Sequence, residues 1–174
     1  LGMAATIRIG FRIGANEITG ARTTALIAFL TTAFVAISGA ILIYLFKEVL
    51  VSLYTTEQAV MSLSITLLLF VVFFLFFDAT QSVCIGALRG YKDTKVPMWL
   101  AIFSYWGVGL PTQLLFGFGY IGEPMGVYGF WLGLAGGVGT AAILLGARLW
   151  YVSGNLELIN RLALHSGRQS VTVS

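Results

Sequence analysis

The chain has 174 residues, of which 58% are hydrophobic and only 10% are charged, and its mean hydropathy is +0.92. An ordinary soluble domain is about 45–50% apolar and about 25% charged, so this composition excludes a soluble globular enzyme. The net charge of +3 is compatible with a nucleic-acid partner. We expect no such partner, because the basic residues are distributed as membrane topology requires.

Long uncharged stretches dominate the sequence. No Asp, Glu, Lys or Arg occurs in residues 23–46, 58–77, 96–122 and 124–147. About 20 apolar residues, rising about 1.5 Å each, cross a hydrocarbon core of about 30 Å, so each stretch is long enough for a spanning helix. The sequence therefore predicts an all-α polytopic membrane protein with four complete transmembrane helices, over residues 23–46, 58–88, 96–119 and 126–151.

Residues 1–16 are mostly apolar and small, apart from Arg8 and Arg12. A helix that ends between Gly14 and Asn16 reaches only about 21 Å, which is too short to span the membrane. A charged chain end inside the bilayer is unfavourable, so we expect a partial helix here and a sequence that lacks its beginning. Arg8 and Arg12 share a helix face, and we expect both to reach toward the cytoplasmic surface.

Two further segments lie outside the predicted spanning helices. Residues 47–57 are expected to connect two helices through a short interfacial helix. Residues 152–174 are expected to form a cytoplasmic tail with one short amphipathic helix, followed by disorder beyond His165.

The basic residues sort to one side of the membrane. Lys47 lies on one side, and the other nine lie on the opposite side: Arg8, Arg12, Arg22, Arg89, Lys92, Lys95, Arg148, Arg161 and Arg168. The positive-inside rule then places the loops at 15–22 and 89–95, and the C-terminus, in the cytoplasm. We expect a multi-pass protein of the inner cell membrane.

The loop at 89–95 gathers four charged residues: Arg89, Lys92, Asp93 and Lys95. We expect them to bind anionic lipid headgroups or to cap helix ends. Asp93 or Thr94 would cap the helix that begins near Pro97.

Asp78 is the one acidic residue inside a predicted spanning helix, and it follows a run of only Phe, Val and Leu over residues 70–77. It precedes Arg89 by eleven residues, which places it about 16 Å below the cytoplasmic interface. A charge at this depth costs about 3 kcal/mol or more, so the group must face water, bind a partner or be protonated. We predict a site that exchanges a proton for sodium or for a cationic substrate. The alternative is a structural Asp that bonds a neighbouring helix.

Gln81 and Ser82 follow Asp78 by three and four residues and share its helix face. They are predicted either to support the site or to link helices through hydrogen bonds. Cys84 and His165 are the only cysteine and histidine, so a His or Cys metal cluster has no support, and Asp78 is the one candidate sodium ligand. No Ser or Cys has a histidine within plausible reach, so we predict neither enzymatic activity nor a cofactor.

Proline and small residues predict local features of the helices. Pro111 removes the hydrogen bond to the carbonyl of Gly107, which predicts a bend that suits either a moving hinge or a static kink. Small residues at four-residue spacing predict two close-packing faces, one at Gly129, Gly133, Gly137 and Ala141 and the other at Ala28, Thr32, Ala36 and Ala40.

Four segments resemble one family. The stretch FDATQSVCIGALRGYKDTKVPM at Phe77–Met98 and the stretch SYWGVGLP at Ser104–Pro111 are similar to the NorM branch of the MATE (multidrug and toxic compound extrusion) transporters. IRIGFRIGAN at Ile7–Asn16 and GFWLGL at Gly129–Leu134 resemble the same branch, in the same order. The resemblance covers nearly all of the chain up to residue 151.

This resemblance implies a fold and a function. Such transporters have twelve helices in two six-helix lobes, and residues 1–151 resemble helices eight to twelve, the C-terminal lobe without its first helix. In the NorM branch an Asp of helix ten joins a Glu of helix seven in the cation site; Asp78 falls on this Asp, and the Glu would precede Leu1. Relatives carry a Tyr one turn before the Asp, where this chain has Phe74 and lacks the hydroxyl.

We therefore expect part of an antiporter in which inward flow of sodium or protons drives the export of amphipathic, often cationic compounds. Its partners would be these small molecules, membrane lipids and the N-terminal part of the same transporter. One rival is a flippase for lipid-linked oligosaccharides, although its cavity should hold several basic residues and only Arg8 lies at any depth here. Another rival is a membrane scaffold subunit that does not transport.

Overall fold

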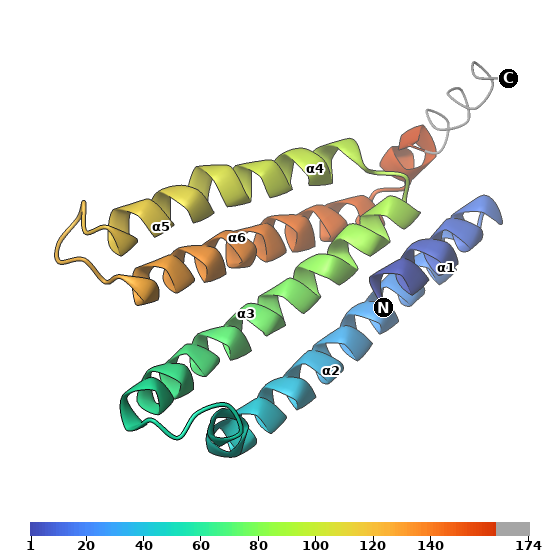
Figure 1. Ribbon diagram of the computed structural model, residues 1–174. Helices are drawn as coiled ribbons and strands as arrows, with labels where there is room; N and C mark the ends of the chain where they lie inside the picture. The colour runs from blue at the N-terminus through green and yellow to red at the C-terminus, as the bar shows by residue number, and fades with distance from the viewer. Residues whose placement is uncertain (163–174) are drawn as a thin grey trace, which may run out of the picture. The chain divides into compact units, whose positions relative to one another are not determined.

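The computed structural model describes residues 1–162, which form helices joined by short connectors, with no strand in that range (Figure 1). Its elements in chain order are α1 (Gly2–Gly14), α2 (Ile18–Ser52), α3 (Gln58–Gly90), α4 (Lys95–Ile102), the π-helix η1 (Phe103–Gly109), α5 (Leu110–Gly117) and α6 (Val127–Gly154). The predicted all-α class is confirmed. The disorder expected beyond His165 lies outside the described residues.

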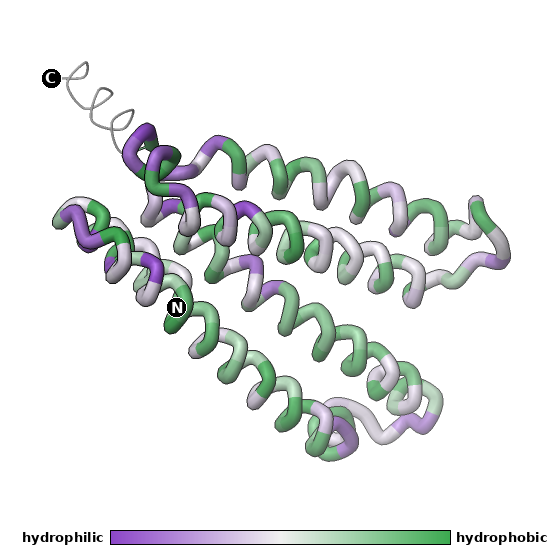
Figure 2. Tube along the Cα trace, turned by 180° about the vertical axis from the view of Figure 1, so that it is seen from behind, coloured by the Kyte–Doolittle hydropathy of each residue, from purple (hydrophilic) through white to green (hydrophobic). Residues whose placement is uncertain are grey.

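Within residues 1–162, three helices are long and apolar enough to cross a membrane: α2, α3 and α6. Figure 2 shows hydrophobic colour along most of α2 and α3, and hydrophilic colour gathered near helix ends and loops. The fourth predicted span, residues 96–119, is helical from Lys95 to Gly117 but consists of three short consecutive elements, α4, η1 and α5.

The largest difference from the predicted boundaries concerns α2. This helix begins at Ile18 and ends at Ser52, so residues 47–52 belong to it. The prediction of a separate interfacial helix within residues 47–57 was therefore wrong. Lys47 Nζ lies 4.6 Å from the ring centroid of Tyr44, one turn earlier in the same helix. Charge marks the end of the apolar segment, whereas the backbone continues its helical hydrogen bonds into the polar region.

The last described residues form a second helical segment. α6 ends at Gly154, slightly beyond the expected end at 151, and residues 156–162 are again helical. Asn155 starts this segment, because its Oδ1 accepts a hydrogen bond of 3.1 Å from the backbone N–H of Leu158. Ile159 is 2% exposed. A short helix with a buried apolar residue therefore follows α6, as expected for the start of the tail.

The chain divides into two compact units. The first unit comprises Leu1–Thr32, Thr80–Ala101 and the chain from Ala142 onward; the second comprises Ala33–Ala79 and Ile102–Ala141.

In the first unit, α1 packs directly on the end of α3. Thr6 Oγ1 donates a hydrogen bond of 2.7 Å to the carbonyl oxygen of Gly86. A Cβ atom added at Gly86 would clash with the backbone of Gly2, and one added at Gly90 would lie 2.7 Å from the Cβ atom of Ile9. The two helices therefore touch because small residues recur every four positions on α3.

In the second unit, the predicted glycine face of α6 packs against η1 and α5, which run beside it (Figure 1). A Cβ atom added at Gly129 would meet the backbone of Phe116, and one at Gly133 would meet the backbone of Gln113. An added Cβ at Gly137 would lie 3.0 Å from Cα of Gly109. This packing face is confirmed as intramolecular. In the other predicted face, on α2, only Thr32 is buried.

Substituting Ala for Gly133 is expected to destabilise the protein by about 2 kcal/mol, because the new methyl group must displace the α5 backbone. Gly136→Ala is the matched control, since a Cβ atom at Gly136 has no neighbour within 4 Å. Thermal unfolding of both variants in detergent measures the difference. Equal midpoints for Gly133→Ala and wild type would show that this helix contact is not close.

Candidate functional site

Asp78 lies within α3, twelve residues before the last helical residue, Gly90. This distance corresponds to about 18 Å along the helix, which is close to the predicted depth. The side chain is half-buried. Within residues 1–162, no hydrogen bond or ion pair holds its carboxylate. The carboxylate is thus accessible from outside these helices.

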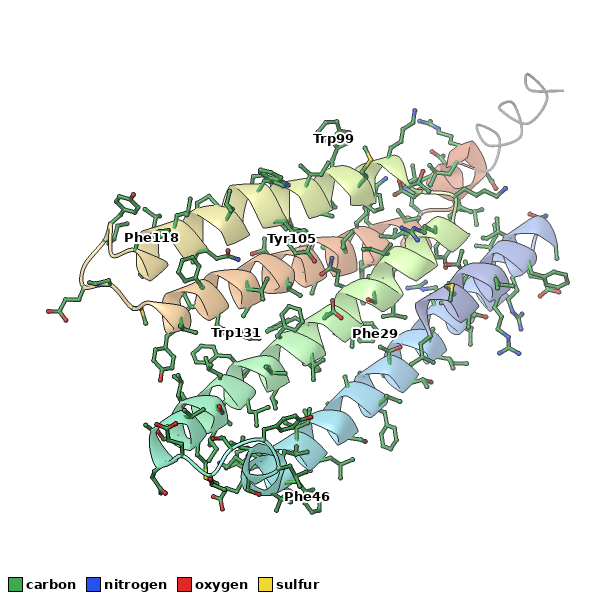
Figure 3. All side chains as sticks on the ribbon, in the orientation of Figure 1. Phe29, Phe46, Trp99, Tyr105, Phe118 and Trp131 are labelled. Carbon is green, nitrogen blue, oxygen red and sulfur yellow. The ribbon has the colours of Figure 1, made fainter. Side chains whose placement is uncertain are left out.

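The helix face that leads to Asp78 is aromatic. The ring centroids of Phe74 and Trp131 lie 6.5 Å apart in an edge-to-face arrangement, and those of Phe70 and Tyr128 lie 6.2 Å apart. Trp131 lies between α3 and α6 (Figure 3). Asp78 follows Phe74 by four residues and therefore continues this face of α3. Phe74, which lacks the hydroxyl that a tyrosine would bring, makes an apolar ring contact here.

Asp78 lies on the same continuous helix as Gln81 and Ser82, which follow it by three and four residues. Gln81 is 7% exposed, whereas Ser82 is exposed. The division of the chain falls between Ala79 and Thr80, so Asp78 and Phe74 belong to the second unit and Gln81 and Ser82 to the first. The position of Gln81 and Ser82 relative to Asp78 is therefore given only by their spacing along α3.

Asp78 is a single carboxylate rather than part of an acidic cluster. In the described part of the chain, no three His, Cys, Asp or Glu residues come together as a metal site would require. Cys84 is a free, buried thiol, and His165 lies outside that part. One carboxylate suits a proton or a weakly held monovalent cation better than a resident divalent metal, which requires several charged ligands.

A π-helix occupies the predicted bend. Over Phe103–Gly109 the backbone hydrogen bonds widen, and the N–H of Leu110 bonds the carbonyl of Tyr105, five residues back. Pro111 is the second residue of α5, so the helix loses one backbone donor directly after η1. Gly107 lies inside this expanded helical turn and Pro111 shortly after it, and such turns are frequently found at functional sites. The bend at these two residues stays a prediction.

The charged loop after α3 forms an ion pair that spacing did not reveal. Arg148 Nε donates a hydrogen bond of 2.8 Å to Asp93 Oδ2, and the Asp93 side chain is only 3% exposed. The carboxylate of Asp93 thus joins the loop to α6, a contact that the sequence analysis did not predict. Lipid binding by the charged loop stays a prediction. The N–H of Met98 bonds the carbonyl of Thr94, which precedes α4 directly.

The MatE family profile matches residues 1–115, well over half of the chain. The chain belongs to the MATE family. The multidrug resistance protein NorM of Aliivibrio fischeri is 39% identical over 156 residues, which cover 89% of this chain and 34% of that protein. The multidrug resistance protein MdtK of Proteus mirabilis is 37% identical over 153 residues, covering 87% of this chain and 34% of its relative.

The fold agrees with this assignment. The crystal structure of the eukaryotic MATE transporter AtDTX14 superposes with a TM-score of 0.79 at 24% identity, covering 92% of this chain and 36% of that one. The MATE chain described here spans about a third of the length of the curated relatives it matches. Members of the MATE family are transporters rather than enzymes.

Tyr91 is a second residue of this MATE chain that sequence reasoning missed. It lies in the loop between α3 and α4, is 0% exposed, and its hydroxyl has no hydrogen-bond partner among the described residues. Burial raises the pKa of Tyr91 to about 12, and the nearby Arg22 guanidinium opposes this shift. The sequence offered only a polar aromatic residue in a charged loop, which is typical of an exposed position.

Tyr91→Phe is expected to make the protein more resistant to alkali. The folded state holds the phenol proton more tightly than the unfolded chain, so this contribution to stability is complete below pH 10.0 and is lost as the pH rises toward about 12. Thermal unfolding of wild type and variant across that range measures the effect. Tyr54→Phe is the control, because Tyr54 is 91% exposed. An identical loss of stability in Tyr91→Phe and wild type would contradict the burial of this phenol.

Proposed function

We propose that this chain forms part of a cation-coupled antiporter that exports amphipathic, often cationic compounds, with Asp78 as the coupling group. One observation carries the proposal: the half-buried carboxylate of Asp78 lies deep within α3, the most hydrophobic of the three candidate spans, and has no partner among residues 1–162. Membership of the MATE family supports it, as do the printed names of the relatives, which describe multidrug resistance.

Asp78 supplies the exchange on which antiport depends. An apolar setting favours the neutral acid, whereas sodium or a cationic compound favours the carboxylate. One group that binds either the coupling ion or the substrate, but not both, links the two movements in opposite directions. Each binding event neutralises a charge that is costly within the membrane.

Other residues would assist this exchange. Gln81 and Ser82 would offer oxygen atoms on the same side of α3, and Phe74 would keep the approach to Asp78 apolar. The expanded turn η1, with Gly107 inside it and Pro111 after it, would be the point at which the helix formed by α4 and α5 bends during transport.

The chain would lie in the inner membrane with its C-terminus in the cytoplasm, because nine of its ten basic residues fall on one side. Its partners would be lipids, small-molecule substrates and the N-terminal part of the same transporter, which in the NorM branch carries a Glu that joins the cation site.

A transport assay with selective ionophores tests the proposal. The intact protein is expressed in cells that lack other drug exporters, and efflux of ethidium, a cationic dye, is followed by fluorescence. Efflux should stop when the coupling gradient is collapsed by a sodium ionophore or by a protonophore, and the effective ionophore identifies the ion. Continued efflux against the dye gradient with both ion gradients collapsed would contradict cation coupling.

A further inference from the structure

A groove of about 450 Å³ lies in the first unit, between α2 and α6, with Cys84 of α3 at its floor. Its two walls have the same pattern. From α2 come Arg22, Ala25, Leu26 and Phe29, and from α6 come Gly146, Leu149, Trp150 and Ser153. Each set follows the i, i+3, i+4, i+7 spacing of one helical face, so the groove runs along both helices.

The groove crosses the boundary between apolar and charged sequence. Arg22 directly precedes the uncharged stretch 23–46 of α2, and the uncharged stretch of α6 ends one residue before Arg148. Trp150 is 79% exposed at this level, which is the usual position of tryptophan at a membrane interface. One end of the groove therefore lies at the depth of lipid headgroups, and the other extends into the hydrocarbon.

The two ends differ in chemistry as well as in depth. Arg22 is exposed and has no acidic partner in residues 1–162. A guanidinium binds a phosphate group through paired hydrogen bonds. Leu26 and Phe29 follow Arg22 by one and two helical turns and add apolar surface to the groove. Phe29 is labelled on α2 in Figure 3.

We propose that this groove binds an anionic phospholipid, with the phosphate on Arg22 and an acyl chain along Leu26, Phe29 and Leu149. The charge selects the occupant: the guanidinium repels a cationic compound and attracts an anionic headgroup. The site is separate from Asp78, so its occupancy does not depend on the proposed transport function.

Quenching of Trp150 by brominated lipids tests this site. A variant of the intact protein that keeps Trp150 as its only tryptophan is reconstituted with either brominated phosphatidylglycerol or brominated phosphatidylcholine. One basic residue near an anionic lipid is expected to favour it about fivefold, so phosphatidylglycerol should bind at Trp150 about fivefold more tightly. Arg22→Gln should bring this ratio close to one, whereas Lys47→Gln, a change at a lysine outside the groove and near the other end of α2, should leave it unchanged.

A second pair of variants tests the acyl-chain position. A Cβ atom at Gly146 or at Gly136 has no neighbour within 4 Å, so a side chain can leave the backbone of α6 at either position without a clash at its first atom. Gly146→Leu fills the groove and should weaken quenching by both lipids, whereas Gly136→Leu, outside the groove, should not. Equal quenching by the two lipids in the parent variant, or a ratio unaffected by Arg22→Gln, would overturn the proposal. Absence of quenching by either lipid would also overturn it, because protein would then cover the groove.

Discussion

Asp78→Asn is expected to abolish gradient-driven efflux while the protein still reaches the membrane. The amide keeps the size and the hydrogen-bonding ability of the side chain but binds neither a proton nor a sodium ion in exchange for a cation. No described residue pairs with the carboxylate, so its removal breaks no ion pair within the helices. Ethidium efflux from energised cells, normalised to the amount of protein in the membrane, measures the effect.

Glu57→Gln is the matched control, because Glu57 also loses one carboxylate charge but lies in the connector between α2 and α3. This variant should transport as wild type does. Normal efflux by well-expressed Asp78→Asn would refute the role of Asp78. A loss of membrane-inserted protein in Asp78→Asn, with normal efflux per molecule, would instead indicate a structural Asp, as a scaffold subunit would have.

Arg148→Leu is expected to destabilise the protein by about 3 kcal/mol, since it leaves a buried carboxylate without its partner. The Asp93 side chain is 3% exposed and that of Arg148 is 20% exposed. Asp93→Asn should cost less, because the remaining guanidinium is the more exposed member of the pair and can reach water. Thermal or denaturant unfolding in detergent measures each variant.

The double variant Asp93→Leu with Arg148→Leu distinguishes the effect of an unpaired charge from the effect of lost side-chain contacts. Removing both charges leaves no unpaired ion, so this variant should be more stable than Arg148→Leu alone. If Arg148→Leu were as stable as wild type, or if the double variant were no more stable than Arg148→Leu alone, the ion pair would not hold the loop to α6.

Sequence patterns predicted those features that depend on neighbours along the chain. The uncharged stretches indicated α2, α3 and α6, since length and apolarity determine what can span a bilayer. The spacing of Gly129, Gly133 and Gly137 indicated a helix contact, because only small residues allow such close approach. Pro111 indicated a disturbed helix, although the missing hydrogen bond did not specify a π-helix.

Features that join distant parts of the chain escaped prediction. Asp93 and Arg148 are 55 residues apart, and nothing in the local charge pattern distinguishes this pair from the other charges nearby. The sequence does contain a pattern that indicates the contact between α1 and α3, because small residues recur every four positions at Ser82, Gly86 and Gly90. The sequence analysis did not use this pattern. The end of α2 was misplaced because a charge such as Lys47 marks a membrane boundary and not the end of a helix.

In the proposed mechanism one carboxylate, that of Asp78, holds either the coupling ion or the substrate. Its most direct test is to measure the ions released when purified, detergent-solubilised protein binds ethidium, with a pH indicator for protons and a sodium-selective electrode for sodium. Wild type should release a proton or a sodium ion as each dye molecule binds, and Asp78→Asn should release neither. The same ion release from Asp78→Asn as from wild type would contradict the account.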